Sequence, residues 1–281
     1  MKDDRLECLI IGYGSAGKRH KRLAEEVGLR VFTCDNVVDD VHYDDARYAL
    51  ADRKWECCVI ATPPDVHLQQ IEWAIEQEVP VLCEKPLCGL GQYKDAVKLS
   101  SKMPVMVAYN WMWHNAVREA RNEVYSVMQR QIDSGREVSM HIALDALQHR
   151  ILPPWGLLLD HVSHDLSIMD EVGNGITDIE KAYFTSSDKW VGWDVYGKTE
   201  RASFRITERV YNADVARRAV VTVSSMGEDK REYELDADNG MYQQMWRDFW
   251  GCKYEGSWQR ALRVQRWLEE CDKIPKEATY G

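Results

Sequence analysis

The chain of 281 residues is 45% hydrophobic and 29% charged, with a formal net charge of −10 at pH 7. This much apolar material is enough for two packed domains and excludes a mainly disordered chain. The negative charge argues against a general nucleic-acid binder or a protein of acidic membranes, because phosphate contacts need a basic surface. Acidic residues stand where a signal peptide would be basic, and no stretch reaches the roughly 20 apolar residues of a membrane span. We therefore expect a soluble, cytoplasmic protein without nucleic-acid or membrane partners.

Apolar runs alternate with helical patterns over the first 110 residues. The clearest helix covers 65–78, where Asp65 is placed to cap the N-terminus. Apolar strands that alternate with helices are typical of a parallel sheet covered on both faces. The sequence therefore predicts an α/β fold in which residues 1–110 form one domain around a parallel sheet. Five runs fit its strands: 5–11, 30–34, 56–61, 79–83 and 104–109.

The alternation ends after residue 110, and longer helices and segments of two-residue periodicity follow. This pattern predicts that residues 111–281 form a C-terminal α+β domain built on a mostly antiparallel sheet. Its expected elements are helix 114–133, strand 136–146, helix 157–172, strands 201–210 and 218–226, and helices from Met241 and Ser257.

The eight cysteines include no C-x-x-C pair. Neither their spacing nor the expected compartment favours a zinc site or disulfides. We therefore expect free thiols and no bound metal. Four of the cysteines lie in the apolar runs that fit strands: Cys8, Cys57, Cys58 and Cys83.

Gly12, Gly14 and Gly17 form a G-x-G-x-x-G pattern directly after the first predicted strand and at the start of the first helix. The first glycine permits a tight turn, the second lets the backbone approach a pyrophosphate, and the third allows close helix–strand packing. Ser15 and Ala16 lie at the helix N-terminus, where N–H groups are free to bind phosphate. The sequence therefore predicts a dinucleotide site, which makes residues 1–110 a Rossmann NAD(P)-binding domain. The alternative is that the glycines only form a tight turn.

Asp35 follows the second predicted strand, 18 positions beyond Gly17. This is near the spacing of about 20 residues at which an acid accepts hydrogen bonds from the adenosine ribose. A carboxylate here favours NAD, because it would repel the 2′-phosphate of NADP. The basic run at 18–22 keeps NADP open as an alternative. Most of this run fits a solvated helix face, and His20 is its one candidate for a direct contact.

Four segments together resemble the Gfo/Idh/MocA family of NAD(P)-dependent oxidoreductases, and the resemblance covers most of the chain. The segments are GYGSAGKRH, ATPPDVHLQQIEWAIEQEVPVLCEKPLCG, YNWMWHNAVREAR and LLLDHVSHDLSIMDEVGN. The resemblance implies that Lys85 is a catalytic lysine, and that Asp160 and His164 hold and deprotonate a substrate hydroxyl. It also favours a cis peptide bond before Pro86 and implies that the C-terminal sheet forms homodimers or homotetramers. The remaining cofactor contacts that it implies are Thr62, Pro63, His67 and Glu84, together with Lys85 itself.

The residues themselves agree with these implied roles. Lys85 follows the fourth predicted strand at its carboxyl end, where open α/β sheets bind ligands. Asp160 and His164 are four positions apart, so on an α-helix they project from one face. The alternatives are a surface lysine, a capping aspartate and a core histidine. A metal held by Asp160, His161 and His164 is a further alternative, but no additional ligand is apparent in the sequence.

This sequence departs from the family pattern in places that concern the substrate. Val162 replaces a glycine that is usual in the family, and Trp111 and Met112 stand where an arginine is common. These departures leave the identity of the substrate open, and they affect the expected catalytic residues less. The candidates for the substrate wall, each with a packing role as the alternative, are Asn110, Trp113, His114, Gln148 and Trp155.

The leading hypothesis is an NAD(P)-dependent oxidoreductase. It would transfer a hydride between the nicotinamide and a secondary hydroxyl or ketone of a sugar, cyclitol or sugar nucleotide. The first alternative is a cofactor-binding regulator or scaffold that performs no chemistry. The second alternative is a reductase of a non-sugar carbonyl compound.

Overall fold

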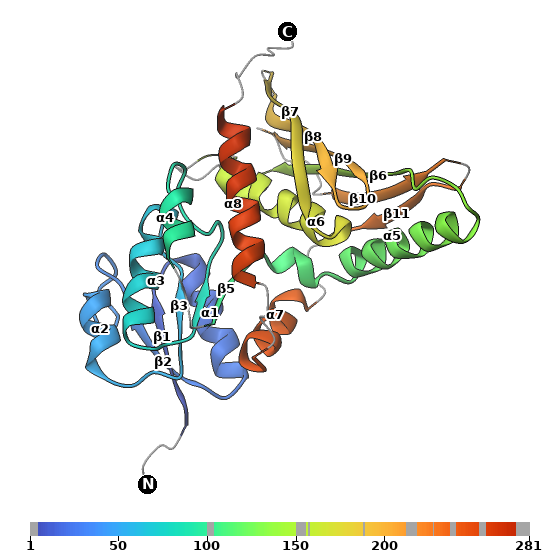
Figure 1. Ribbon diagram of the computed structural model, residues 1–281. Helices are drawn as coiled ribbons and strands as arrows, with labels where there is room; N and C mark the ends of the chain where they lie inside the picture. Colours follow the sequence, from blue (N-terminus) through green and yellow to red (C-terminus); the bar gives the residue numbers. More distant parts are fainter. Residues whose placement is uncertain are drawn as a thin grey trace. The chain divides into compact units, whose positions relative to one another are not determined.

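The computed structural model describes residues 5–99, 104–149, 156, 158–187, 189–211, 218–226, 228–236, 240–252 and 257–273. Two units emerge from the contacts within the chain (Figure 1). The first contains the residues up to Tyr109 together with Tyr242–Leu262. The second contains Asn110–Met241 and the residues from Arg263 onward.

A five-stranded parallel sheet forms the centre of the first unit, with the strand order β2-β1-β3-β4-β5. Nearly every residue of these strands is buried, because a parallel sheet covered by helices has no solvent-facing side. The order changes direction at β1, so that β2 lies on one side of it and β3 on the other. Such a switch point is where open α/β sheets bind ligands. The strands are β1 (Glu7–Ile11), β2 (Arg30–Cys34), β3 (Cys57–Ile60), β4 (Val81–Cys83) and β5 (Val105–Val107).

Helices lie on both faces of this sheet, with α2 and α3 on one side and α1 and α7 on the other (Figure 1). The predicted cap of Asp65 is wrong. The chain enters α3 through a 3₁₀ turn that begins at Pro64, so Asp65 lies inside the turn and Val66 occupies the N-cap. The helical elements are α1 (Ser15–Glu26), α2 (Ala46–Asp52), η1 (Pro64–Val66), α3 (His67–Glu76), α4 (Tyr93–Lys98) and α7 (Met241–Trp250).

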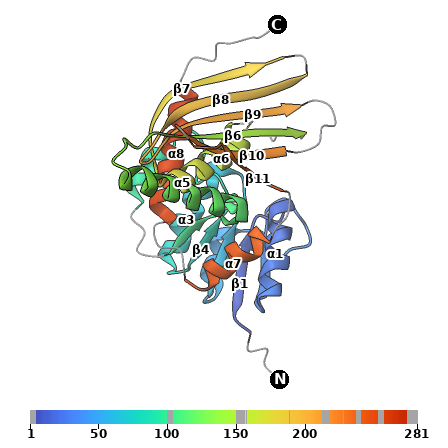
Figure 2. The same cartoon turned by 90° about the vertical axis from the view of Figure 1, so that its right-hand side faces the viewer.

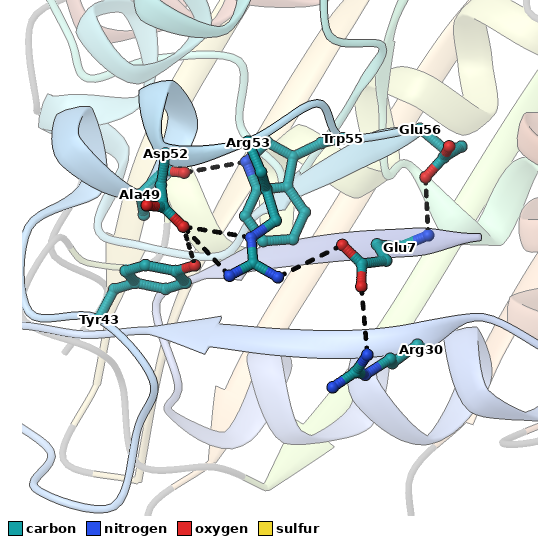
Figure 3. Close-up of polar contacts among 8 residues, drawn as sticks. All are labelled: Glu7, Arg30, Tyr43, Ala49, Asp52, Arg53, Trp55 and Glu56. Carbon is teal, nitrogen blue, oxygen red and sulfur yellow. Dashed lines mark hydrogen bonds and ion pairs between the residues drawn. The ribbon is translucent and has the colours of Figure 1, made fainter. Parts of the chain in front are cut away.

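A polar network holds the amino ends of these strands (Figure 3). The backbone N–H of Glu7 donates to the carboxylate of Glu56 at 2.7 Å. The Glu7 carboxylate lies 3.4 Å from a guanidinium nitrogen of Arg30 and 3.5 Å from one of Arg53. Arg53 also pairs with Asp52 at 3.2 Å. Side chains of the first unit itself therefore occupy this edge, and the opposite, carboxyl edge carries the candidate site.

A six-stranded sheet forms the second unit, with the order β11-β10-β6-β9-β8-β7. The β6–β9 pair is parallel and the other pairs are antiparallel, which confirms the predicted α+β architecture. Helices α5 and α6 lie along one face of this sheet (Figure 2). The strands are β6 (Met140–His149), β7 (Ile176–Ser186), β8 (Trp190–Thr199), β9 (Ser203–Tyr211), β10 (Arg218–Ser225) and β11 (Arg231–Glu234).

The helices of the second unit follow the predicted positions with one difference. The helix expected over 157–172 consists of a π-helical turn and then an α-helix. Its end is anchored by Asp170, whose carboxylate accepts two hydrogen bonds from Arg263 at 3.0 and 2.8 Å. The elements are η2 (Asn110–Trp113), α5 (Asn115–Asp133), the π-helical turn η3 (Leu158–Val162), α6 (Ser163–Gly173) and α8 (Ser257–Lys273).

All eight cysteines are free thiols; seven are buried, and Cys252 is exposed. No group of three or more metal-binding side chains gathers among the residues that the structure describes. In the same part of the chain, no helix combines the length and the apolar character needed to cross a bilayer.

Candidate functional site

A cavity of about 600 Å³ lies at the carboxyl edge of the parallel sheet. Its walls come from the loops that follow β1, β2 and β3 and from α3, which together surround the switch point. This is the place where the sequence predicts a dinucleotide. The predicted cofactor residues that line it are Gly12, Gly14, Asp35, Thr62 and Pro63.

The glycines of the loop have separate roles. Gly12 has a φ of +90°, and a Cβ there would lie 2.6 Å from the backbone carbonyl of Ala61. A Cβ on Gly17 would collide with the carbonyl oxygen of Gly12. Gly14 differs, because a Cβ on it would meet no atom within 4 Å. Gly12 and Gly17 are therefore required by the packing of the loop, whereas Gly14 leaves space for a ligand.

Asp35 is held as an anion at the end of β2. Its carboxylate accepts hydrogen bonds from the backbone N–H groups of Tyr13 at 2.7 Å, Val37 at 2.8 Å and Val38 at 3.2 Å. Burial raises the pKa of Asp35, but these three donors outweigh burial and lower it below its ordinary value. The ionised carboxylate can accept hydrogen bonds from ribose hydroxyls and repels an added phosphate.

Two more carboxylates, those of Asp44 and Asp45, line the same end of the cavity. Their charges and that of Asp35 add to burial and raise the pKa of the Cys34 thiol to about 12. This end of the cavity is therefore strongly negative, which disfavours the 2′-phosphate of NADP.

The sequence left His20, in the basic run of α1, as a candidate for direct contact with the cofactor. The structure gives this side chain other partners. This side chain is fully buried, and its ring nitrogens lie 2.9 Å from the Glu84 carboxylate and 3.0 Å from the Trp246 indole nitrogen. Arg19 donates a hydrogen bond to the hydroxyl of Tyr242 at 2.7 Å. His20 therefore supports the fold of the unit and is not free to bind a phosphate.

Glu84 and Lys85 follow β4 at the same edge of the sheet as the cavity. Burial raises the pKa of Glu84, but the hydrogen bond from His20 and the charge of Lys85 outweigh it and lower the pKa to about 2. The Glu84 carboxylate also accepts a hydrogen bond from the backbone N–H of Lys85 at 3.2 Å. The Lys85–Pro86 peptide bond is cis, as the resemblance predicts.

His67 is buried between the two loops that follow β3 and β4. Its Nε2 lies 2.8 Å from the carbonyl oxygen of Thr62, and its Nδ1 lies 3.0 Å from that of Pro86. Burial lowers the pKa of His67, although both carbonyls favour the protonated ring. The side chain therefore joins these loops, and it is not among the residues that line the cavity. We place it as a support for Thr62, whose hydroxyl donates to Gln70 at 2.7 Å.

In the second unit, Asp160 lies inside the π-helical turn and His164 lies in the first turn of α6. The prediction that both side chains share one face requires a single α-helical period from Asp160 to His164. The π-helical turn breaks that period. Asp160 is buried and His164 is partly exposed. The neighbouring His161 is buried too, and it lies 3.2 Å from Asp160 and 3.4 Å from Glu208 of β9.

The candidates for the substrate wall fall into different environments. The amide of Asn110 is buried and donates to Sδ of Met241 at 3.4 Å. His114 caps α5 by accepting the Ala116 N–H at 3.1 Å, and its other ring nitrogen lies 2.7 Å from Asp236. These two side chains therefore have packing roles, whereas Trp113 is partly exposed. Trp155 and the side chain of Gln148 lie outside the described residues.

Comparison with protein families identifies the first unit. Residues 6–111 match the GFO_IDH_MocA model, described as an oxidoreductase family with an NAD-binding Rossmann fold. This part of the chain therefore has the NAD-binding Rossmann fold of the Gfo/Idh/MocA oxidoreductases. The resemblance found in the sequence and the prediction of NAD are confirmed. A comparison with curated proteins found no match.

Solved structures share the fold of this chain over nearly its whole length. The WlbA (WbpB) dehydrogenase from Thermus thermophilus, crystallised with NAD and α-ketoglutarate, is 15% identical; the match covers 97% of this chain and 96% of that one, with a TM-score of 0.70. A myo-inositol dehydrogenase from Corynebacterium glutamicum is 14% identical, with 96% of each chain covered and a TM-score of 0.73. A probable dehydrogenase from Thermotoga maritima is 12% identical, with 95% and 98% covered and a TM-score of 0.74. At these identities the likeness establishes the fold.

Several residues in and around the candidate site were not predicted from the sequence. Asp45 had a local signal, since its carboxylate caps α2 by accepting the Tyr48 N–H at 2.6 Å. Nothing local indicates that the loop before α2 reaches the cavity. Glu208 also had a signal, because it interrupts the buried row of an alternating strand. The missed cavity residues with carboxylate, amide or aromatic side chains are Asn36, Asp44, Asp45, Gln70 and Trp73.

Proposed function

We propose that the protein is an NAD-linked dehydrogenase that acts on a secondary hydroxyl, or the corresponding ketone, of a sugar, cyclitol or sugar nucleotide. One observation carries this proposal. Lys85 follows β4 at the same sheet edge as Gly12, Asp35 and Thr62, which line the cavity. A lysine in that position can take part in proton transfer beside a cofactor.

The chemistry divides between the cofactor and the chain. When NAD is bound, its nicotinamide accepts the hydride that leaves the carbinol carbon. Loss of that hydride turns the carbinol into a carbonyl group and releases the hydroxyl proton. His164 or Lys85 takes this proton, and Asp160 accepts the hydrogen bond that orients the hydroxyl. The reduction follows the same path in reverse.

The two domains have separate tasks in this proposal. Residues 1–110 bind the cofactor, with Ser15 and Ala16 at the N-terminus of α1 placed for the pyrophosphate. Residues 111–281 bind the substrate, with Trp113 at the wall of its site, and form the contact in a homodimer or homotetramer. The cytoplasmic location expected from the sequence stays a prediction.

The solved structures support this substrate class through what they bind. The Thermus thermophilus dehydrogenase was also crystallised with NAD and UDP-GlcNAcA, a sugar nucleotide. The Corynebacterium glutamicum protein is a myo-inositol dehydrogenase, which acts on a cyclitol. UDP-GlcNAcA and myo-inositol both carry secondary hydroxyl groups.

A substrate panel tests the proposal. The purified protein is mixed with NAD and, in separate wells, with myo-inositol, other polyols, sugars and UDP-sugars, and the nicotinamide absorbance is followed. Lys85→Ala is expected to lower turnover about 10²–10⁴-fold while NAD affinity is retained. Lys98→Ala, an exposed lysine of α4 paired with Asp95, is the matched control and should turn over normally.

Three outcomes would contradict the proposal. Normal turnover by Lys85→Ala would remove the catalytic role of this lysine. NAD binding without turnover of any compound would favour a cofactor-binding regulator or scaffold. Turnover restricted to carbonyl compounds that are not sugars would favour the reductase alternative.

A further inference from the structure

A carboxylate interrupts the apolar face of β9. Side chains alternate along this strand, and the row that faces the interior contains Phe204, Ile206 and Val210. Glu208 stands in the same row and is fully buried. Isolated carboxylates are costly to bury, so such a group is normally matched by a positive partner.

His161 is that partner, and it stands between two carboxylates. Its Nδ1 lies 3.4 Å from Oε1 of Glu208, and its Nε2 lies 3.2 Å from Oδ2 of Asp160. All three side chains are at least nine-tenths buried. The contacts have ion-pair distances, and they join β9 to the π-helical turn through one imidazole ring.

The two carboxylates favour the protonated form of the ring. Burial lowers the pKa of His161, but the carboxylates of Asp160 and Glu208 outweigh burial and raise it above its ordinary value. Asp160 of the same turn and Glu208 of β9 are the charged groups that act on the ring. The protonated ring has a carboxylate at ion-pair distance from each of its two nitrogens, although these contacts do not have the geometry of hydrogen bonds.

We propose that Glu208 is a positioning residue that acts through His161 to fix the orientation and the ionised state of the Asp160 carboxylate. The inference rests on the proposed function, because Asp160 matters to the reaction only if it binds the substrate hydroxyl. Glu208 and His161 are not catalytic residues here, since neither is asked to touch the substrate.

The place of Asp160 in the chain explains why another residue should hold its carboxylate in position. Asp160 lies in a π-helical turn, which lacks the regular hydrogen bonding of an α-helix. His161 links the carboxylate on this turn to Glu208 of another element. β9 provides a fixed anchor, since it lies inside the six-stranded sheet between β6 and β8.

The test compares Glu208→Gln with Glu171→Gln in the full chain. Glu171 is the matched control, because it is a buried carboxylate of α6 whose ion pair is with a different residue, Arg121, at 2.7 Å. In the first arm, NMR follows the titration of the His161 ring and the carboxyl carbon of Asp160. Glu208→Gln should lower the pKa of His161, and the Asp160 resonance should shift as the ring loses its proton. Glu171→Gln should leave both unchanged.

In the second arm, turnover of the active panel compound is measured from about pH 6 to about pH 8, around the ordinary pKa of histidine. The rate of Glu208→Gln relative to wild type should fall as the pH rises through the lowered pKa of His161. This relative rate should fall by up to about tenfold for each unit by which the pKa of His161 is lower in Glu208→Gln than in wild type. Glu208→Asp keeps the charge and should restore part of the rate at the upper end.

Each result supports or overturns the inference. An unchanged His161 titration in Glu208→Gln overturns it. A rate lost equally at every pH also overturns it, because that pattern indicates a structural defect. If no panel compound turns over, the proposed function fails. The two NMR titrations then decide by themselves whether Glu208 controls the charge beside Asp160. Should Glu208→Gln not fold, Glu208→Asp is used in both arms, with a smaller change of the same sign expected.

Discussion

The indole Nε1–H of Trp246 donates a hydrogen bond to Nδ1 of His20 at 3.0 Å, across 226 positions of the sequence. Because Nδ1 accepts this bond, Nε2 must carry the ring hydrogen that is donated to Glu84 at 2.9 Å. A chain of hydrogen bonds therefore runs from α7 through α1 to the residue before Lys85. It couples the position of the proposed catalytic lysine to a helix from the end of the sequence.

Trp246→Phe should weaken this coupling. The substitution removes the indole donor from a buried site, so the free energy of unfolding should fall by about 1–3 kcal/mol, and NAD affinity should fall with it. Trp267→Phe is the control, because Trp267 also donates its indole N–H, at 3.2 Å, but to Ile176 in the second unit. Chemical denaturation and NAD titration check both variants. Equal losses of NAD affinity would contradict a specific role for Trp246.

Glu84 should make the protein sensitive to acid. Its pKa of about 2 in the folded chain lies below the ordinary value of 4.5, so its stabilising effect is complete above about pH 4.5 and is lost as the pH falls toward 2. The difference corresponds to about 3 kcal/mol. Glu84→Gln should be less stable near neutrality and should lose less stability between pH 5 and pH 3. Urea unfolding across this range measures the effect, and parallel curves for the two proteins would contradict it.

The first sheet could be predicted because its strands are continuous apolar runs. Residues 7–11 and 57–60 do not alternate between polar and apolar side chains, as expected for a sheet covered on both sides. The glycine loop and Asp35 could be found for a similar reason, since a tight turn and a ribose contact impose a local spacing. These features depend on short-range chemistry.

The features that could not be predicted depend on contacts between distant parts of the chain. The helical pattern of 241–250 shows that Trp246 faces an apolar environment, but not that this environment belongs to the first unit. A period of 3.6 residues predicts that Asp160 and His164 share a face, and the π-helical turn removes that premise. The alternation of β9 placed Glu208 in the buried row, yet only the fold brings His161 beside it.

Gly12→Ala and Gly14→Ala should separate folding from binding. At Gly12 a Cβ lies 2.6 Å from the Ala61 backbone and φ is +90°, so alanine should lower the free energy of unfolding by about 1–3 kcal/mol. At Gly14 a Cβ meets no atom within 4 Å, so alanine should change stability by less than about 1 kcal/mol. The added methyl group should nevertheless lower NAD affinity about tenfold or more. Normal NAD affinity in Gly14→Ala would contradict a phosphate site at this loop.

Asp35→Ala should weaken NAD binding about 10–100-fold, because hydrogen bonds to a charged group contribute about 1.5–3 kcal/mol. NADP should lose less affinity, since a repulsive charge is removed as well. Asp44 and Asp45 remain at that end of the cavity. The ratio of NAD affinity to NADP affinity should therefore fall but stay above one. Fluorescence titrations with both cofactors measure the ratio. Asp39→Ala, an exposed residue of the same loop, is the control. An unchanged ratio in Asp35→Ala would place the ribose elsewhere.

Arg263→Ala should destabilise the second unit. Asp170 is buried, and loss of its guanidinium partner leaves a carboxylate with less compensation. Breaking a buried ion pair costs about 3–5 kcal/mol, and the partial exposure of Arg263 places this pair near the lower end. Lys273→Ala removes an exposed pair with Glu270 from the same helix and should change stability by less than about 0.5 kcal/mol. Thermal unfolding compares the two, and similar midpoints would contradict the role of Asp170.

Residues 242–262 belong to the first unit, so the ribosome must translate the whole second sheet before the cofactor domain has all of its parts. A nascent chain that has reached only Tyr109 contains every strand of the parallel sheet but neither Trp246 nor Tyr242, the partners of His20 and Arg19. N-terminal domains usually mature first during synthesis, and here the last step of that maturation is delayed. The hydrogen bonds between α7 and α1 are then among the last contacts of the parallel-sheet unit to form during synthesis.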